Sequence, residues 1–341
     1  MSVLELRDVE VEYSRSGRTP VRAVAGASLS VDAGQIVGLV GETGCGKSTL
    51  ARAAVGLVAP TAGSVWFEGR ELRPIGRRAR SRTDARLQMV FQNPFSSLNP
   101  RRRVGDQIAD GMAILGLVPA NRRRERVSAL LEQVGLPAAA ARRFPHQYSG
   151  GQRQRIAIAR ALAAQPSVIV LDEPLSSLDA SAQAQVANLL TGLARELRVG
   201  LLLISHDLAI VRHIADTVAV MYLGLLVETA PTRRLWSAPL HPYTEALIEA
   251  IPRADGKGWL PESLPGEVPD PARPPDGCRF HPRCPYAFAK CRSESPPLLD
   301  VASGRRVACW LHEHGDAERA PSTFASRTRE SSGAGDQVDG V

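Results

Sequence analysis

The segment GETGCGKS, from Gly41 to Ser48, matches the P-loop pattern G-x-x-x-x-G-K-[ST] at every fixed position. The apolar run Ile36 to Val40 before it predicts a buried strand, and Ser48 to Leu57 after it predicts a helix with one apolar stripe. Glycines let the backbone N–H groups of such a loop close around phosphate oxygens. We therefore expect Lys47 to reach the β- and γ-phosphates of a nucleotide and Ser48 to bind Mg²⁺.

A second motif, LDEP, spans Leu171 to Pro174 and follows a β-branched run that begins at Val168. The run predicts a central parallel strand, and open α/β sheets place their sites at the carboxyl ends of such strands. Asp172 is then positioned to orient Mg²⁺. Glu173 is the next carboxylate, and we expect it to polarise the attacking water as a general base.

A third motif, YSGGQ, spans Tyr148 to Gln152 and precedes a strongly helical run. Small residues at a helix N-terminus, capped here by Ser149, offer free N–H groups and a positive dipole end to a phosphate. The P-loop already binds the phosphates of the local nucleotide. A second phosphate-binding motif in one chain therefore suggests that it serves the nucleotide of another chain.

Together the three motifs resemble the ATPase subunit of an ABC transporter. The resemblance implies an α/β fold of the P-loop NTPase (RecA-like) type, an ABC nucleotide-binding domain with a helical subdomain. It also implies ATP and Mg²⁺ as cofactors. In this family the YSGGQ signature faces the P-loop of a partner subunit, and two ATP molecules lie between the two chains.

Further segments lie where this family has functional residues. Gln92, in QMVFQNP, resembles the Q-loop glutamine that senses Mg²⁺ and water and touches the membrane subunits. His206, in LLLISHD, resembles the switch histidine that contacts the γ-phosphate. SSLD, Ser176 to Asp179, resembles the D-loop that crosses the dimer interface. Tyr13 is the aromatic residue predicted to stack on adenine, and a half-buried core position is its alternative.

The resemblance thus assigns catalytic roles to Glu173, His206 and Gln92, and Mg²⁺ ligation to Ser48, Gln92 and Asp172. The residues expected to bind ATP are Tyr13, Gly41, Glu42, Thr43, Gly44, Cys45, Gly46, Lys47, Ser48, Thr49, Gln92, Asp172, Ser149, Gly150, Gly151 and Gln152. Cys45 is interpreted as a small residue that the loop tolerates, with no redox role.

Composition narrows the partners of this 341-residue chain. Its net charge is +7, with basic clusters at 77–78, 101–103 and 122–124, but no aromatic interleaving or nucleic-acid module accompanies them. We therefore predict no nucleic-acid binding.

The longest apolar run, Thr217 to Val227, falls short of the roughly 18–20 residues that span a bilayer. The N-terminus shows no secretory pattern, which predicts a peripheral position at the cytoplasmic face of the membrane.

The chain is predicted to divide into three parts. Residues 1–250 form the nucleotide-binding domain, with the helical subdomain at about 92–155. Residues 251–313 form a small irregular extension, because eleven of the 25 prolines lie between Pro252 and Pro297 and exclude long helices. Residues 314–341 lack an apolar period and are predicted to be disordered. No internal repeat is present, which predicts a single cassette.

The C-terminal extension restricts the resemblance to one part of the ABC transporter family. HPYTEAL, His241 to Leu247, precedes LPGEVPDPARPPDGCRFHPRCPYAFAKC and VACW, and this arrangement is similar to the C-terminal extension of dipeptide and oligopeptide importer ATPases. Nickel and glutathione importers share it. The resemblance implies a second ATPase subunit (identical or homologous), two membrane permease subunits and an extracytoplasmic substrate-binding protein. A non-transport ABC ATPase acting in DNA repair or translation is the alternative, and a generic P-loop ATPase is a third hypothesis that YSGGQ disfavours.

Four of the five cysteines lie in this extension: Cys278, Cys284, Cys291 and Cys309. Such clustering in an intracellular chain favours metal binding over disulfides. The C-x₂-C spacing of structural zinc sites is absent, and irregularly spaced sets of four cysteines bind iron–sulfur clusters. Similar extensions in the dipeptide importer family carry a [4Fe–4S] cluster, which the resemblance implies here. Reduced thiols that pack a small subdomain, or a zinc ion, are the alternatives.

Overall fold

The computed structural model describes residues 2–14, 19–76, 80–93, 97–251, 266–302 and 304–313, with only the backbone described at Ala302. Three parts of the sequence predictions lie outside the described residues. They are the basic pair at 77–78, residues 252–265 of the proline-rich segment, and the tail at 314–341, for which disorder was predicted.

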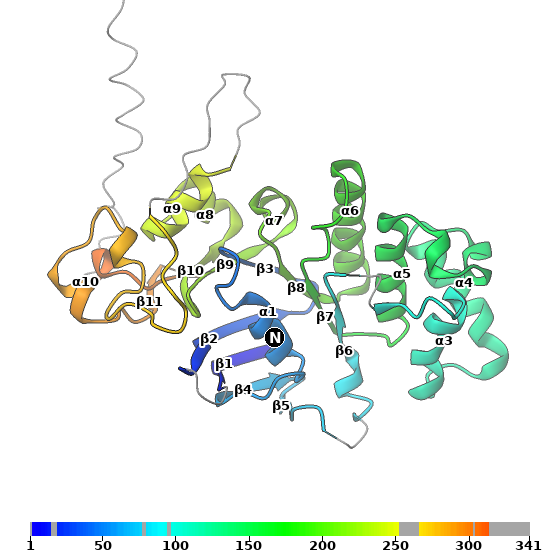
Figure 1. Ribbon diagram of the computed structural model, residues 1–341. Helices are drawn as coiled ribbons and strands as arrows, with labels where there is room; N and C mark the ends of the chain where they lie inside the picture. The colour runs from blue at the N-terminus through cyan, green and yellow to red at the C-terminus, as the bar shows by residue number, and fades with distance from the viewer. Residues whose placement is uncertain are drawn as a thin grey trace, which may run out of the picture.

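Two sheets form the centre of the molecule (Figure 1). The smaller is antiparallel in the order β2-β1-β4-β5, and the larger runs β11-β12-β10-β9-β3-β8-β7-β6. The strands are β1 Ser2–Tyr13, β2 Val21–Asp32, β3 Ile36–Val40, β4 Ala62–Phe67, β5 Arg70–Glu71, β6 Leu87–Val90, β7 Val168–Asp172, β8 Gly200–Ile204, β9 Thr217–Tyr222, β10 Leu225–Pro231, β11 Leu299–Ala302 and β12 Arg305–Val307. Strands β9, β3, β8, β7 and β6 are parallel neighbours.

Helices cover both faces of the larger sheet and build one end of the molecule (Figure 1). They are α1 Lys47–Ala54, α3 Val104–Ile114, α4 Arg123–Gln133, α5 Gly150–Leu162, α6 Ala180–Leu197, α7 Leu208–Ile214, α8 Thr232–Ser237, α9 Pro242–Glu249 and α10 Ala289–Ser293. Short 3-10 turns are η1 Asp84–Arg86, η2 Ala120–Arg122, η3 Ala138–Arg142, η4 Pro145–Gln147, η5 His281–Arg283 and η6 Trp310–His312. Helices α3 and α4 lie at the opposite end from β11 and α10.

The expected strand before the P-loop is β3, and all five of its residues are buried. Val37 and Leu39 pack into the core that holds α1, whereas Ile36 and Val40 pack into the core that holds α6 and α7. A parallel strand covered on both faces needs apolar residues at successive positions, which is why this run is continuous rather than alternating. The layered arrangement fixes the P-loop at the carboxyl end of β3.

The predicted helix Ser48 to Leu57 is wrong at its end. Helix α1 stops at Ala54, because Gly56 adopts a left-handed conformation with φ of 72°. Leu57 N then bonds back to Arg52 O and Gly56 N to Ala53 O, the paired contacts of a Schellman cap. Leu57 therefore lies outside the helix and is 45% exposed instead of continuing the apolar stripe.

The C-terminal extension is partly built into the larger sheet. Strand β12 pairs with β10, and β11 pairs with β12, so the extension adds two antiparallel strands to the sheet edge. Arg305 lies 3.2 Å from the fully buried carboxylate of Glu228 on β10. Local sequence patterns predicted an irregular segment and did not predict these strands. Helix α10, five residues long, is the longest helix in its described part, as the prolines imply.

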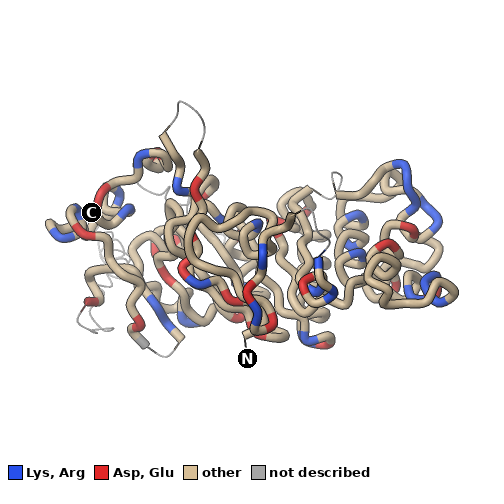
Figure 2. Tube along the Cα trace, turned by 90° about the horizontal axis from the view of Figure 1, so that it is seen from below, with Lys and Arg blue, Asp and Glu red and all other residues tan. Residues whose placement is uncertain are grey.

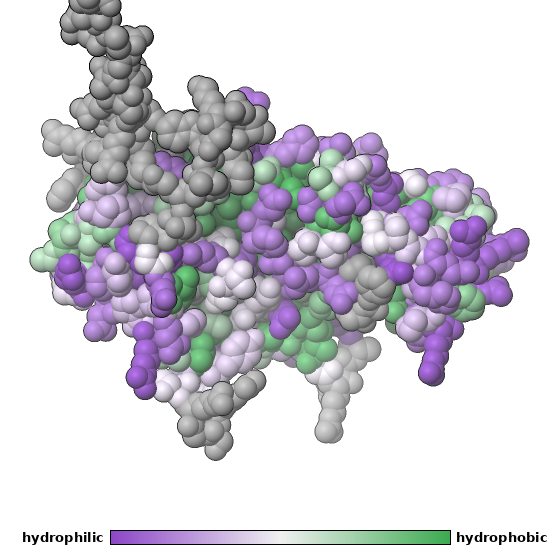
Figure 3. Space-filling view, turned by 45° about the horizontal axis from the view of Figure 1, so that its top comes forward, coloured by the Kyte–Doolittle hydropathy of each residue, from purple (hydrophilic) through white to green (hydrophobic). Residues whose placement is uncertain are grey.

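The surface carries many charges. Figure 2 shows Lys and Arg at the outer side of the α3–α4 end as well as beside the sheets. In the space-filling view hydrophilic residues predominate over that helical end (Figure 3). Among the described residues, none of the helices combines the length and apolar character needed to cross a bilayer.

Candidate nucleotide site

The P-loop lies tightly against two neighbouring carbonyl groups. A Cβ at Gly41 would overlap the carbonyl oxygen of Met221, and one at Gly46 would overlap that of Ala23. Both glycines have positive φ, 151° and 108°. Only glycine combines this backbone conformation with so close an approach. The loop is thereby fixed between β2 and β9, at the start of α1.

The side chains of the P-loop motif converge at the same place. Lys47 is 5% exposed, and its Nζ donates to the carbonyl oxygens of Gly41 and Glu42, at 2.8 Å each. Ser48 Oγ donates to Asp172 Oδ1 at 2.8 Å, across the gap between α1 and β7. Burial raises the pKa of Asp172, and the bond from Ser48 opposes that shift. A hydroxyl and a carboxylate in contact are the oxygen donors that Mg²⁺ prefers.

Glu173 contacts the other two residues that were predicted to be catalytic. Gln92 Nε2 donates to Glu173 Oε2 at 2.9 Å, and His206 Nδ1 lies 3.4 Å from the same oxygen. Glu173 has a left-handed φ of 47°, a strained conformation held by its N–H bond to Ile204 O. Strained non-glycine residues cluster at functional sites. Three elements far apart in sequence thus bring these side chains together.

A cleft of about 470 Å³ contains most of this set. It is lined by Ala23, Thr43, Gly44, Gly46, Lys47, Ser48, Thr49, Gln92, Glu173 and His206. Of the other residues predicted for the nucleotide, Gly41, Glu42, Cys45 and Asp172 do not line the cleft, although each is a P-loop residue or contacts one. Tyr13 is 42% exposed at the end of β1 and does not line the cleft in this conformation.

The YSGGQ signature lies at the N-terminus of α5, as predicted. Ser149 caps the helix by accepting from Gln152 N, and the Gln152 side chain accepts from Ser149 N. Ser149 is exposed and lines a separate cavity of about 300 Å³ with Gly151, Gln152 and Arg155. That cavity shares no lining residue with the P-loop cleft. Asp179, the last residue of the predicted D-loop, caps the adjacent helix α6.

The four cysteines of the extension line one small pocket, together with His281 and Tyr286. Burial raises the pKa of Cys284 to about 11 and that of Cys309 to about 12. Such thiols are protonated at neutral pH, whereas metal ligation requires thiolates. Across the described chain, which includes all four, no three His, Cys, Asp or Glu side chains are arranged to hold a metal ion.

Known proteins match both parts of the chain. Residues 24–176 match the family described as ABC transporter, and residues 227–291 match the oligopeptide/dipeptide transporter C-terminal region. The di/tripeptide transport ATP-binding protein DppF of Pseudomonas aeruginosa is 47% identical over 90% of this chain and 97% of that protein. The oligopeptide transport ATP-binding protein AppF of Bacillus subtilis is 44% identical over 91% and 98%.

The chain belongs to the family of ABC transporter ATP-binding proteins. The fold agrees. The ATP-binding cassette MJ0796, solved as a dimer with ADP and Pi, superposes with a TM-score of 0.61 at 26% identity, covering 67% of this chain and 99% of that one. The protein cbiO1 of Clostridium perfringens, part of the ABC transporter complex cbiONQ, gives a TM-score of 0.61 at 27% identity, covering 69% of this chain and 91% of that one. As a member of this family the chain is an ATPase coupled to transport.

Two residues that contact the P-loop at this candidate site were not predicted from the sequence. Glu42 N donates to the hydroxyl of Tyr243 at 2.9 Å, and the Glu42 carboxylate contacts Arg283 of the extension. Tyr243 lies in the HPYTEAL segment and Arg283 in CRFHPRC, both of which stood out in the sequence. Nothing local links them to the P-loop, because Tyr243 lies 201 residues and Arg283 lies 241 residues from Glu42 along the chain.

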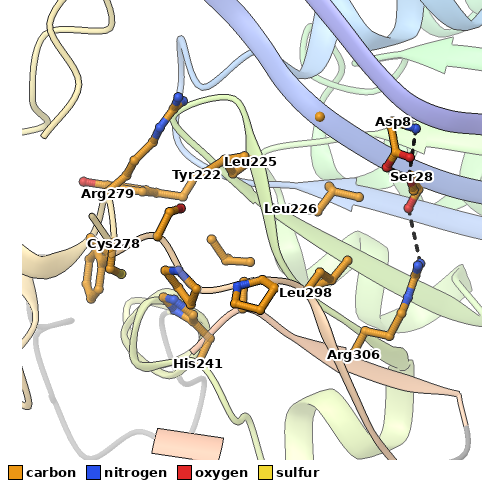
Figure 4. Close-up of a pocket in the computed structure, with 17 residues that line it drawn as sticks. Asp8, Ser28, Tyr222, Leu225, Leu226, His241, Cys278, Arg279, Leu298 and Arg306 are labelled. Atoms are coloured by element: carbon orange, nitrogen blue, oxygen red, sulfur yellow. Dashed lines mark hydrogen bonds between the residues drawn. The ribbon is translucent and has the colours of Figure 1, made fainter. Parts of the chain in front are cut away.

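His241 is the N-cap of α9 and lines the same pocket as Cys278 of the extension (Figure 4). It is 1% exposed, and its Nδ1 accepts from Tyr243 N at 3.0 Å, which requires the neutral ring. Burial, and then the neighbouring His312, lower the pKa of His241 to about 3. In the unfolded chain the imidazole of His241 takes up a proton below about pH 6.5. Stability from neutral His241 is therefore full above about pH 6.5 and is lost as pH falls towards 3.

We predict that His241→Asn removes this pH dependence. Asparagine keeps the N-cap but does not titrate. The free energy of unfolding of wild type minus that of His241→Asn, measured by denaturant titration, should fall between pH 7 and pH 4. A difference that stays constant over this range would contradict a neutral, buried His241.

Proposed function

We propose that this chain is the ATP-hydrolysing subunit of an importer for dipeptides, oligopeptides or related small solutes. The convergence of Gln92 and His206 on Glu173, beside the P-loop, carries the catalytic part of the proposal. The peptide part is supported by the matching C-terminal region and by relatives named for di/tripeptide and oligopeptide transport. Those relatives do not support the alternative of DNA repair or translation.

In the proposed reaction the P-loop N–H groups and Lys47 bind the phosphates of ATP. Ser48, Asp172 and Gln92 are the proposed ligands of Mg²⁺, which supplies charge neutralisation at the phosphates when bound. Glu173 accepts a proton from the attacking water, and His206 contacts the γ-phosphate. Tyr13, exposed at the end of β1, is the proposed adenine-stacking ring.

The second half of each site is proposed to come from another chain. Ser149, Gly150 and Gly151 form a capped helix N-terminus at the surface, and their cavity is separate from the P-loop cleft. A positive helix end exposed in this way fits the γ-phosphate of a nucleotide held by a partner. The partner is a second ATPase subunit, identical or homologous, and the D-loop lies next to the same interface.

The other proposed partners follow from the family. Peptide importer ATPases work with permease subunits and a substrate-binding protein. We propose two permeases that contact the Gln92 region and an extracytoplasmic binding protein that selects the cargo, with the chain peripheral at the cytoplasmic face of the membrane. No nucleic-acid partner is proposed. We also propose that the helical subdomain spans about 92–155 and that the C-terminal extension spans 251–313.

Glu173→Gln tests the proposed general base. The amide keeps the shape of the side chain but cannot accept the proton, so ATPase of the assembled transporter should fall at least ~100-fold. Affinity of the isolated subunit for MgATP should be unchanged. Glu196→Gln, at an exposed position of α6, is the matched control and should keep wild-type turnover. Turnover of Glu173→Gln within about tenfold of wild type, a barrier change of only ~1.4 kcal/mol, would contradict the assignment.

We also propose that Cys278, Cys284, Cys291 and Cys309 hold a [4Fe–4S] cluster. Their common pocket supports the proposal, although the described side chains do not form a preformed metal site. Binding would require deprotonation and rotation of the thiols. Packed reduced thiols and a zinc ion remain the alternatives. The cluster is assigned a structural or redox-sensing role rather than a part in ATP hydrolysis, since no hydrolysis motif lies beyond His206.

The cluster proposal predicts iron and acid-labile sulfide, four of each per chain, in protein purified without oxygen. Cys→Ser at any of the four positions should remove the visible absorbance and increase proteolysis of the extension. Cys45→Ser, in the P-loop, is the control and should retain the cluster. Colourless protein without iron and sulfide would overturn the proposal, and one zinc per chain would favour the zinc alternative.

A further inference from the structure

Arg283 of the extension reaches the P-loop directly. Its Nη1 lies 2.8 Å from Glu42 Oε2, and its Nη2 lies 3.0 Å from Glu42 Oε1. The side chain of Arg283 is 3% exposed and that of Glu42 is 19% exposed. A bidentate ion pair that is buried in this way fixes the orientation of the two side chains and the distance between them, whereas an exposed ion pair does not.

The residue held by Arg283 is itself bonded to the phosphate-binding lysine. Glu42 O accepts from Lys47 Nζ at 2.8 Å, and Glu42 N donates to Tyr243 at 2.9 Å. The side chain, the N–H and the carbonyl of Glu42 are therefore each fixed by a different partner. A shift of Glu42 would move the carbonyl that Lys47 contacts.

A second arginine of the same segment supports the P-loop from another side. Arg279 donates to the carbonyl of Leu223, in the turn between β9 and β10. The next residue, Gly224, donates its N–H to Cys45 O in the P-loop at 2.8 Å. Figure 4 shows Arg279 beside Tyr222, in a cleft of about 380 Å³ between the extension and the cassette.

Aromatic packing holds Arg283 in place. Its guanidinium lies 5.8 Å from the ring centroid of Tyr222 and 5.9 Å from that of Phe280. These two rings and Tyr243 form one buried cluster. Burial is the largest single influence on Arg283 and opposes its charge, but the hydrogen bonds and charge interactions with Glu42 and Tyr222 together outweigh it and raise the pKa of the arginine. Arg283 is therefore a permanent cation at this position.

We propose that Arg283 is a positioning residue of the ATP site, which orders Glu42 and so places Lys47 for the phosphates of ATP. The inference rests on the proposed nucleotide site and adds the extension to it. Both arginines that support the P-loop lie between Cys278 and Cys284. The four-cysteine segment is thus connected to ATP binding by two side chains.

A double-mutant cycle on the full chain tests this coupling. Arg283→Met and Glu42→Gln should each weaken MgATP binding about tenfold, equivalent to ~1.4 kcal/mol. The double variant should bind no more weakly than the poorer single variant, because both changes remove the same pair. In the assembled transporter the single variants should raise KM for ATP more than they lower kcat. Glu42→Gln is isosteric and tests the pair without altering the extension.

Lys290→Met is the matched control. It breaks another ion pair of the extension, Lys290 to Glu313 at 2.5 Å, which does not touch the P-loop. Its MgATP affinity should stay within about twofold of wild type. Provided that wild type binds MgATP, either of two results would overturn the inference. One is a double variant whose loss of MgATP affinity equals the product of the two single losses, and the other is unchanged MgATP affinity in Glu42→Gln. Failure of wild type to bind MgATP would instead overturn the proposed function, and this inference with it.

Discussion

The close contact of the P-loop backbone with its neighbours is the constraint on which the site depends. Gly41 and Gly46 lie where any side chain would overlap the carbonyls of Met221 and Ala23. These carbonyls come from different sheets, so the loop is ordered only when both sheets pack around α1. The positions of Lys47 and Ser48, and the contact of Ser48 with Asp172, follow from that packing. The phosphate-binding geometry is therefore a property of the whole layered fold, rather than of eight residues.

The same packing places the predicted site residues on two separate surfaces. Glu173, Gln92 and His206 meet at the P-loop cleft, whereas the capped α5 N-terminus opens on a different cavity. An exposed helix N-terminus leaves backbone N–H groups without protein partners. A second nucleotide-bearing chain would satisfy them, and this is the physical reason behind the dimerisation that we propose. The extension lies at the other end of the sheet and reaches the P-loop through Arg283.

Local patterns predicted the elements that carry the chemistry. The buried runs of β3 and β7, and the Ser149 cap of α5, were recognisable because each depends on neighbouring residues. The predicted end of α1 was wrong because Gly56, in a left-handed conformation, stops the helix before Leu57. Strand pairing of β12 with β10 and the contact between Arg283 and Glu42 depend on tertiary packing. Such contacts join residues far apart in sequence, so no local pattern reports them.

Ser149→Arg gives the most direct test of a site shared between two chains. A large cation at the α5 N-terminus should block the partner's γ-phosphate without touching the P-loop cleft. The account predicts that ATPase of the assembled transporter falls at least ~100-fold, a barrier increase of about 2.7 kcal/mol, while the isolated subunit binds MgATP as wild type does. Loss of MgATP binding by the isolated Ser149→Arg subunit would show that the signature acts on its own nucleotide, and would contradict the account.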